Sequence, residues 1–446
     1  MTAGGAITQT GAITANALTA KTLVNAGAAI TLNNAGNDVA TVDLRARNAA
    51  DTANASGALS YRDANGFDVA GVSTGGALTL QSNGNITQSG AMTVAGLTTL
   101  TAGAGNDITL THAVNNFGSV GIVSGRDVSL TDSNALGLAA STVASSLTLN
   151  AGGSVTQTGA IVAPVLHANL TGAASALTLS TAGNHIAQLG GISTPGGFSL
   201  NNGNNAIAVN GVISTGNTAV SLTSGTGVTS FGTSGAIATG GGNVTLTNSN
   251  SAKLLGNIDT TGGAGTGNLT VTGAGVISQQ AATTLKVKGT TSIAAGAGND
   301  VTLTNAGNDF GGAVAVTTGR NVALNDANAL VLGTSAVSGT LGVTTGGAIT
   351  QTGAVVVTGA TTLTAGAGNN ITLTNAGNNF AAVSVMSGNN VSLRDSNALV
   401  LGASSVGGAL SVTAGGAITQ TGAITANALT AKTLVNAGAA ITLNNA

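Results

Sequence analysis

Short apolar runs that alternate with threonine and serine recur along nearly the whole chain. Typical runs are ITLT from Ile371, VSL from Val391 and LVL from Leu399. A period of two places Val, Ile and Leu on one face of an extended strand and the hydroxyl side chains on the other. Clusters of Gly, Asn, Asp and Ser separate the runs and supply the residues that turns favour. The pattern predicts an all-β chain whose short strands begin every 7 to 11 residues.

The same order of runs and turns repeats along the chain. The stretch from Ala365 to Ala423 has near-copies that begin at Ala102 and Ala295 and end in phrases resembling GGAITQTGA. An Ile/Val-Thr/Ser-Gln step within this phrase begins at Ile7, Ile86, Val155, Ile277, Ile349 and Ile418. The commonest spacing between these steps is 69 to 72 residues. Such a period indicates one structural unit stacked many times, each copy covering the apolar face of the next.

An antiparallel sandwich and a parallel coil are the two arrangements that could accommodate these strands. Two-residue Asn-Gly turns, which join paired antiparallel strands, are scarce between the runs. If three strands form one triangular turn, a unit of about 70 residues makes three turns of about 23 residues, and the chain makes about 19. Parallel crossovers are overwhelmingly right-handed. We therefore expect a right-handed parallel β-helix, or β-solenoid, with about three turns per ~70-residue repeat.

The repeat extends over residues 1–446, which we expect to form a single continuous β-helical rod. Residues 2–35 are identical to residues 413–446, so the chain reads as a fragment of a longer tandem array. Two stretches depart from the period. The first copy has nine extra residues, which predict an inserted loop near 43–58. Residues 191–275 are degenerate repeats that keep strand-like runs, and we expect the coil to continue through them.

The composition suits a narrow coil better than a globular core. Hydrophobic residues make up 42% of the chain, but only 2% of residues are aromatic and Trp is absent. A net charge of -2 provides no basic surface for nucleic acid, and no apolar run is long enough to span a membrane. The absence of Cys excludes disulfides and thiolate metal sites. We therefore expect no nucleic-acid partner and no membrane insertion.

Asparagine and phenylalanine recur at fixed places in the unit. The asparagines of the D-x-N-A-L phrase are expected to stack their amides into ladders along the coil axis. They are Asn134, Asn328 and Asn397. The phenylalanines that close another repeated step are expected to be internal aromatic residues, with a ligand-binding strip as the alternative. They are Phe117, Phe310 and Phe380.

Charged residues are rare, and they concentrate around the inserted loop. The candidate binding residues there are Asp43, Arg45, Arg47, Asp51, Tyr61, Arg62, Asp63 and Asp68. One use for such a loop is the binding of a carbohydrate or another surface. The other is catalysis on an acidic polysaccharide, which needs several carboxylates and basic groups lining one groove. Because only 11 Lys and Arg and 13 Asp and Glu are dispersed over 446 residues, we expect no enzyme and assign no catalytic residue.

Metal and cofactor sites are not expected. The histidines, which share no repeat position and no ligand spacing, are His112, His167 and His185. The phrase GAGND at 103–107 and 296–300 resembles a calcium-binding nonapeptide, but it does not recur every nine residues. Its third copy has Asn370 in place of the carboxylate. Outward Thr-Leu-Thr steps leave an ice-binding hydroxyl array as a further alternative.

Several phrases of the unit resemble a known family. AGAGNDITLT, NDFGGAV, ALVLGTSAVSG and GGAITQTGA are similar to the repeat region of filamentous-haemagglutinin-like exoproteins, the secreted partners of two-partner secretion systems. The resemblance covers nearly the whole chain and is weakest over residues 191–275. It implies a right-handed β-helical fibre on, or shed from, a Gram-negative surface. The family's N-terminal secretion domain has no counterpart in these residues.

The leading hypothesis is a non-enzymatic structural segment of an extracellular filamentous adhesin or surface fibre. It would serve as a rigid shaft for adhesion, aggregation or biofilm, with a carbohydrate-binding or polysaccharide-processing β-helix as the alternative. The expected partners are neighbouring repeats or identical chains end to end, since unpaired strand edges favour open head-to-tail association. Host or bacterial surface glycans are further candidate partners. The expected location is secreted or cell surface, in a Gram-negative bacterium.

Overall fold

The computed structural model describes residues 1–249, 251–434 and 438–444, and within them the chain forms strands and turns. No helix in this described part is long and apolar enough to cross a membrane. The chain divides into two compact units, Met1–Gly216 and Asn217–Ala446. Each unit is described by itself.

The strands of the first unit are β1 (Thr2–Ala3), β2 (Ile7–Thr8), β3 (Thr14–Leu23), β4 (Ile30–Leu32), β5 (Asp38–Arg47), β6 (Leu59–Arg62), β7 (Phe67–Thr74), β8 (Leu78–Gln81), β9 (Ile86–Gln88), β10 (Met92–Thr101), β11 (Ile108–Leu110), β12 (Asn116–Asp132), β13 (Leu136–Leu138), β14 (Ser141–Ala151), β15 (Val155–Gln157), β16 (Ile161–Leu170), β17 (Leu177–Leu179), β18 (His185–Ser193), β19 (Phe198–Asn201), β20 (Ile207–Val209) and β21 (Val212–Ser214).

The strands of the second unit are β22 (Val220–Thr223), β23 (Thr229–Phe231), β24 (Ala236–Ala238), β25 (Val244–Thr247), β26 (Lys253–Leu255), β27 (Asn257–Asp259), β28 (Leu269–Thr272), β29 (Ile277–Gln279), β30 (Leu285–Val287), β31 (Thr291–Ala294), β32 (Val301–Leu303), β33 (Asp309–Phe310), β34 (Val314–Thr318), β35 (Val322–Asp326), β36 (Leu330–Leu332), β37 (Ser335–Val337), β38 (Leu341–Thr345), β39 (Ile349–Gln351), β40 (Val355–Thr364), β41 (Ile371–Leu373), β42 (Asn379–Ser387), β43 (Val391–Asp395), β44 (Leu399–Leu401), β45 (Ser404–Ser405), β46 (Ala409–Ala414), β47 (Ile418–Gln420), β48 (Ile424–Thr425), β49 (Ala428–Thr433) and β50 (Ile441–Thr442).

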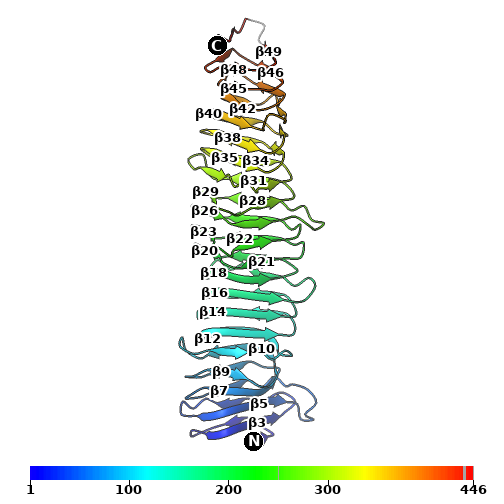
Figure 1. Cartoon of the computed structure of the whole chain (residues 1–446). Helices are drawn as coiled ribbons and strands as arrows, with labels where there is room; N and C mark the ends of the chain where they lie inside the picture. Colours follow the sequence, from blue (N-terminus) through cyan, green and yellow to red (C-terminus); the bar gives the residue numbers. More distant parts are fainter. Residues whose placement is uncertain (250, 435–437, 445–446) are drawn as a thin grey trace. The chain divides into compact units, whose positions relative to one another are not determined.

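Each strand pairs in parallel with the strand that occupies the same place one turn further along the chain (Figure 1). In the first unit β3 pairs with β5 and β5 with β7; in the second, β22 pairs with β25 and β25 with β28. The fold is a parallel β-solenoid of about 21 turns with about 21 residues per turn, so a repeat of about 69 residues makes three turns. The prediction of a β-solenoid with three turns per repeat is confirmed.

The turns are shorter than the expected 23 residues because several strands continue through a corner of the coil. Strand β12, for example, runs for 17 residues from Asn116 to Asp132. It pairs with β10 and β14 through register shifts, one of them between Gly125 and Asp127, where the strand bends. Fewer residues are then needed to connect one strand to the next, so each turn of the solenoid is shorter and the number of turns exceeds the expected 19.

The core is a set of aliphatic columns that run from turn to turn. Ile108, Val128, Leu147 and Leu166 pair in successive strands, and each is at most 1% exposed. Residues on either side of them face outward, as the period of two requires. The degenerate stretch keeps the same construction, since β25 and β28 pair in register and their inward Val and Leu side chains are buried. Within the second unit, the part of this stretch that contains β25 and β28 is therefore built like the other turns.

The recurring phenylalanines lie inside the coil, as predicted. Phe117, Phe310 and Phe380 are 1%, 2% and 0% exposed. The backbone N–H of each donates to a buried aspartate that follows later in the same repeat. These aromatic rings therefore belong to the core and are not part of a surface strip.

Candidate binding site at the inserted loop

The insertion forms a loop at residues 48–58, between β5 and β6. The first part of the predicted 43–58 loop is strand, because Asp43, Arg45 and Arg47 lie in β5. The residues between them, including Leu44 and Ala46, are fully buried. The alternation of inward aliphatic and outward charged side chains is that of a strand, so these three charged residues stand on the wall of the coil.

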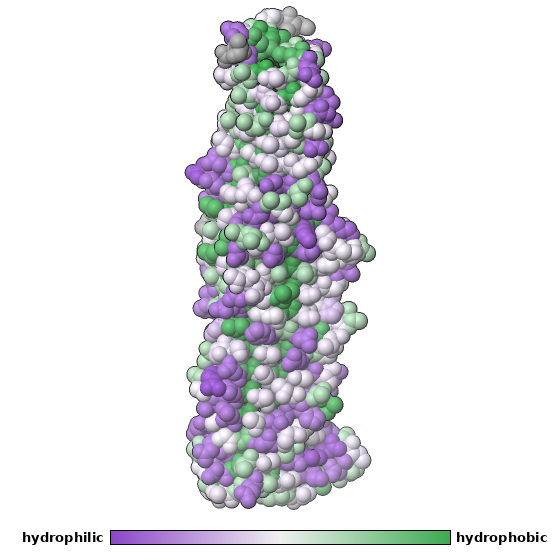
Figure 2. Space-filling model, in the orientation of Figure 1, coloured by the Kyte–Doolittle hydropathy of each residue, from purple (hydrophilic) through white to green (hydrophobic). Residues whose placement is uncertain are grey.

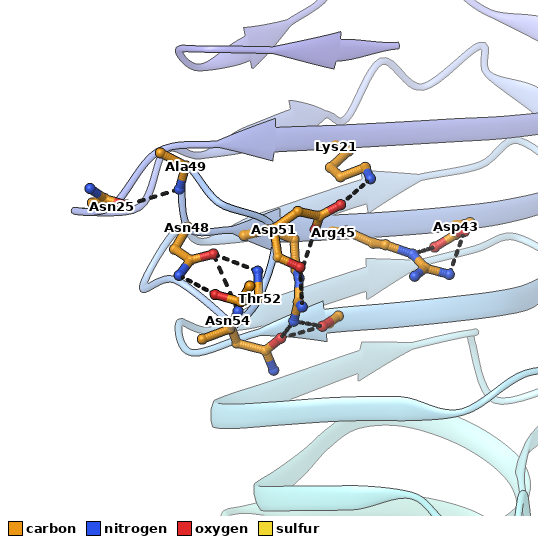
Figure 3. A network of polar contacts seen from close by, with 12 residues as sticks. Lys21, Asn25, Asp43, Arg45, Asn48, Ala49, Asp51, Thr52 and Asn54 are labelled. Atoms are coloured by element: carbon orange, nitrogen blue, oxygen red, sulfur yellow. Dashed lines mark hydrogen bonds and ion pairs between the residues drawn. The ribbon is translucent and has the colours of Figure 1, made fainter.

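Asp51 is the centre of a charge network that fastens the loop to the neighbouring turn (Figure 3). Lys21 Nζ, from β3, lies 2.7 Å from Asp51 Oδ2, and Arg47 Nε lies 3.1 Å from Asp51 Oδ1. Arg47 also donates from Nη2 to the Asp51 carbonyl at 3.0 Å. The hydrogen bonds from Lys21 and then Arg47 lower the pKa of Asp51. The carboxylate is thus held in its charged form by two cations of this chain.

Asparagine side chains order the backbone of the same loop. Asn48 Oδ1 accepts the N–H of Thr52 at 2.8 Å, and Asn25 Oδ1 accepts the N–H of Ala49 at 2.9 Å (Figure 3). Asp51 has a φ of 55°, in the left-handed region that Asp tolerates better than most residues. The loop is therefore folded back on the coil by local hydrogen bonds.

A second ion pair lies beside this network on β5. Arg45 Nε and Nη2 donate to the two oxygens of Asp43 at 2.8 and 2.9 Å. This bidentate hydrogen bond raises the pKa of Arg45. Asp43 and Arg45 thus form one bidentate ion pair on the wall of the coil.

Tyr61 and Asp63 are core residues and not part of a surface site. Both are 0% exposed, and the Tyr61 ring packs edge-on against Phe67 with ring centres 5.0 Å apart. The Tyr61 hydroxyl donates to the Asp63 carboxylate, and burial together with this carboxylate raises the pKa of Tyr61. Asp63 also accepts the N–H groups of Val39 at 2.9 Å and Asn65 at 2.8 Å. The sequence interpretation of both residues as binding residues is wrong, because the period of two points them inward.

Arg62 and Asp68 lie apart from the Asp51 network. Among the described residues, no hydrogen bond or ion pair joins either side chain to Asp51, Arg47 or Lys21. Asp68, on β7, accepts the hydroxyl of Thr87 at 3.2 Å and that of Ser89. The Nε of Arg62 is buried without a hydrogen-bond partner. The predicted residues therefore divide into a loop network, an ion pair on the wall, a core pair and two separate outward charges.

The most regular polar feature of the chain is a pair of amides that the sequence interpretation missed. The glutamine of the Ile-Thr-Gln step and a buried asparagine about one turn further on exchange two hydrogen bonds. In the second unit, Gln351 Nε2 donates to Asn378 Oδ1 at 2.8 Å, and Asn378 Nδ2 donates to Gln351 Oε1 at 2.9 Å. Asn378 also accepts the N–H of Val355 and donates to the carbonyl of Leu373. We call this arrangement the amide clamp.

Among the described residues, the amide clamp occurs at five levels. The pairs are Gln9–Asn37, Gln88–Asn115, Gln157–Asn184, Gln279–Asn308 and Gln351–Asn378. Each of the five asparagines is 0% exposed. The sequence does contain both residues of the clamp at recurring positions of the repeat. Only the folded coil brings the glutamine and the asparagine together.

The asparagines that were expected to form ladders have a different role. Asn134, Asn328 and Asn397 are exposed, and the backbone N–H of each donates to the aspartate two residues before it. These aspartates also accept the N–H of the internal phenylalanines. They are Asp132, Asp326 and Asp395. Burial raises the pKa of all three carboxyl groups, although the backbone hydrogen bonds oppose the shift.

The aspartate of the GAGND phrase pairs with an arginine. Asp107 binds Arg126 at 2.6 and 2.8 Å, and Asp300 binds Arg320 at 2.8 and 2.9 Å, each arginine coming from the next turn. The hydrogen bond from Arg320 lowers the pKa of Asp300 to about 2. In the third copy Asn370 replaces the aspartate, and no arginine occupies the corresponding place. Over the residues that the structure describes, no three His, Cys, Asp or Glu side chains converge on a metal position.

The parallel coil and its repeated clamps define a β-solenoid repeat protein. The chain belongs to the family described as repeats of unknown function (DUF5649), whose model matches residues 1–44, 56–124, 125–193, 241–317, 319–387 and 388–446. The matched segments follow the three-turn repeat, and the unmatched residues 194–240 fall in the degenerate stretch. No curated protein and no solved structure matches the chain.

Proposed function

We propose that this chain is a non-enzymatic structural segment of an extracellular filamentous adhesin or surface fibre. Its role is that of a rigid shaft for adhesion, aggregation or biofilm. The observation that carries the proposal is the amide clamp, which recurs at five levels with the asparagine fully buried each time. A repeated, fully satisfied buried polar contact fixes the register of successive turns, which is what a structural shaft requires.

The charged side chains also favour a structural role. Asp43, Arg47 and Asp51 are engaged with cations or anions of the same chain, and the loop that carries Asp51 is tied to the coil. A catalytic groove for acidic polysaccharide needs carboxylates and basic groups that are free to meet the substrate. Surface hydrophilic residues are interspersed with pale and hydrophobic ones on the face drawn in Figure 2, with no single large patch of one kind.

The extracellular, Gram-negative setting rests on the resemblance to filamentous-haemagglutinin-like exoproteins. In that setting the partners are neighbouring repeats or identical chains end to end, with surface glycans as candidates for recognition. Stacked repeats contact only their neighbours, so a solenoid can be extended without redesigning its surface. That property suits a spacer between a cell and its target.

Surface display tests the proposed function. The chain is placed between an outer-membrane anchor and a small ligand-binding tip on Gram-negative cells, and attachment to ligand-coated beads through the cells' polysaccharide layer is counted. We expect attachment to exceed that of cells in which a Gly/Ser-rich linker with the same number of residues replaces the chain, because a flexible linker coils. Equal attachment with the two spacers would contradict a shaft role. Release of sugars from acidic polysaccharides by the purified chain would contradict the non-enzymatic part.

A further inference from the structure

One lysine lies inside the coil where other turns have aliphatic side chains. Lys253 begins β26 and is 0% exposed. Its column continues through Ile277, Val301, Val322 and Leu341, which are all buried. No ion pair with Lys253 is formed among the described residues, and burial alone lowers its pKa to about 8. A buried ammonium without a counter-ion is costly, so this position requires an explanation.

The amine of Lys253 rests against the side chain of a buried asparagine. Lys253 Nζ lies 2.6 Å from Asn248 Oδ1 and 2.6 Å from the carbonyl oxygen of Thr272. Asn248 is 2% exposed, and its Nδ2 donates to Ser251 Oγ at 2.8 Å. This hydrogen bond turns the amide so that its carbonyl faces the amine and its nitrogen faces away.

The absence of a side chain at Gly273 creates the space for this contact. A Cβ at Gly273 would lie 2.1 Å from Asn248 Oδ1 and 2.4 Å from Lys253 Nζ. Gly273 directly follows Thr272, whose carbonyl accepts the lysine hydrogen bond. The turn above therefore confines the amine and the amide to one small enclosed space.

We propose that Lys253 and Asn248 join in an intramolecular isopeptide bond. The unprotonated Lys253 Nζ attacks Asn248 Cγ, so that a new N–C bond forms and the bond from Cγ to Nδ2 breaks. The amine loses one proton to the departing nitrogen, which leaves as ammonia. One amide replaces another, no oxidant or reductant is needed, and the atoms balance.

Two observations and one property of the product support this reaction. Lys253 Nζ lies 2.6 Å from Asn248 Oδ1, so the amine is held beside the amide that it would attack, and fixed proximity of this kind accelerates intramolecular reactions. Burial favours the neutral amine, which is the reactive form. The product contains no ionisable group, so the bond leaves no amine that could be charged in the core.

Mass spectrometry of the purified, unlabelled chain tests the proposal. After incubation at a pH above 8, we expect an intact mass lower than that of the sequence by one ammonia. We also expect a peptide in which residues 248 and 253 are joined. Trypsin should fail to cleave after Lys253 in the denatured chain, because an acylated lysine is not a substrate. Lys253→Met should restore the mass of its own sequence, whereas Lys286→Met, which changes an exposed lysine, should keep the loss of ammonia.

Two outcomes would overturn the proposal. One is an unchanged intact mass with efficient tryptic cleavage after Lys253. The other is conversion of Asn248 to Asp, which makes the chain slightly heavier and would create a buried ion pair in place of the bond. Gly273→Ala adds a test of geometry, since it should abolish the cross-link while Gly298→Ala, where an added Cβ meets nothing, should not. A full cross-link in folded Gly273→Ala would also contradict the proposal; if that variant does not fold, the wild-type mass decides.

Discussion

At the scale of single residues, buried polar groups give this narrow coil its specificity. Aliphatic columns can slide past one another at little cost, but a buried amide or carboxylate has partners in one register only. The amide clamp and the aspartates of the D-x-N-A-L phrase occupy defined levels in each repeat. These buried amides and carboxylates are held by hydrogen bonds, so changing one of them should alter the free energy of unfolding.

The first prediction concerns Asn378. In Asn378→Ala the N–H of Val355 and the carbonyl of Leu373 lose the Asn378 side chain as a hydrogen-bond partner inside the coil. The Gln351 amide loses its two hydrogen bonds to Asn378 and keeps those to Gly353 and Asn375. We expect the free energy of unfolding to fall by about 2 to 4 kcal/mol, because unsatisfied buried groups cost about 1 to 3 kcal/mol each. Chemical denaturation measures the change. Asn379→Ala, which alters the next residue on the half-buried start of β42, is the control and should change stability little; equal losses in the two variants would contradict the clamp.

The second prediction concerns Asp395 and pH. Burial raises the pKa of Asp395 in the folded chain above its ordinary value of 3.8. At pH values between 3.8 and this raised pKa, the folded chain therefore binds more protons than the unfolded chain. The contribution of Asp395 to the free energy of unfolding therefore decreases as pH rises through this window and is largest below 3.8. Asp395→Asn should remove this pH dependence. An asparagine can make the same backbone contact, since Asn202 Oδ1 accepts the N–H of Ile186 at the corresponding position of another turn.

Denaturation of wild type and variant over a series of pH values measures the difference. Asp300→Asn provides the opposite sign, because Arg320 lowers the pKa of Asp300 to about 2. The stability that Asp300 provides is present above 3.8 and is lost as pH falls toward about 2. The same pH trend in both variants would show that burial does not control Asp395.

At the scale of elements, alternation predicted the strands, whereas corners depended on contacts between turns. Strand β5 carries the same alternation as its neighbours, yet its charges led to the interpretation of Asp43, Arg45 and Arg47 as loop residues. Corners differ because successive turns touch there. At Gly346 an added Cβ would lie 2.1 Å from the carbonyl oxygen of Ala327 in the turn below.

The third prediction concerns this contact between turns. Gly346→Ala should lower the free energy of unfolding by about 1 to 3 kcal/mol, because the backbone must shift to admit the methyl group. Gly298→Ala is the matched control, since an added Cβ there meets nothing within 4 Å. Thermal unfolding followed by circular dichroism compares the two. A Gly346→Ala protein as stable as the control would mean that the turns do not stack as closely as described.

At the scale of the whole molecule, the repeat is a module. Stability in such arrays is a sum over repeats and their contacts with nearest neighbours. Each unit of this chain contains several matched repeats, and a matched segment of the second unit runs from 319 to 387. The residues at which equivalent segments begin, Gly319 and Gly388, both bridge to a valine in the next turn.

The fourth prediction concerns removal of that module. Deleting residues 319–387 joins Thr318 to Gly388 in the phase of the repeat, so every remaining strand can still pair in parallel. We expect an unchanged β-type circular dichroism spectrum per residue and a melting temperature within a few degrees of wild type. Deleting residues 319–377 removes an incomplete set of turns and shifts the clamps out of register. This deletion should reduce both the β-type circular dichroism signal and the melting temperature. Equal tolerance of the two deletions would contradict a three-turn module.

The sequence by itself determined the fold class, the three-turn repeat and the inward position of Phe117, Phe310 and Phe380. It could do so because strand alternation and repeat length are local or periodic properties. Only the tertiary structure decided that Asn378 meets Gln351, that Tyr61 and Asp63 are buried and that Lys253 touches Asn248. Such contacts depend on the length of each turn and on the direction in which each side chain points. A shift of one residue in the register of a strand moves a side chain from the core to the surface.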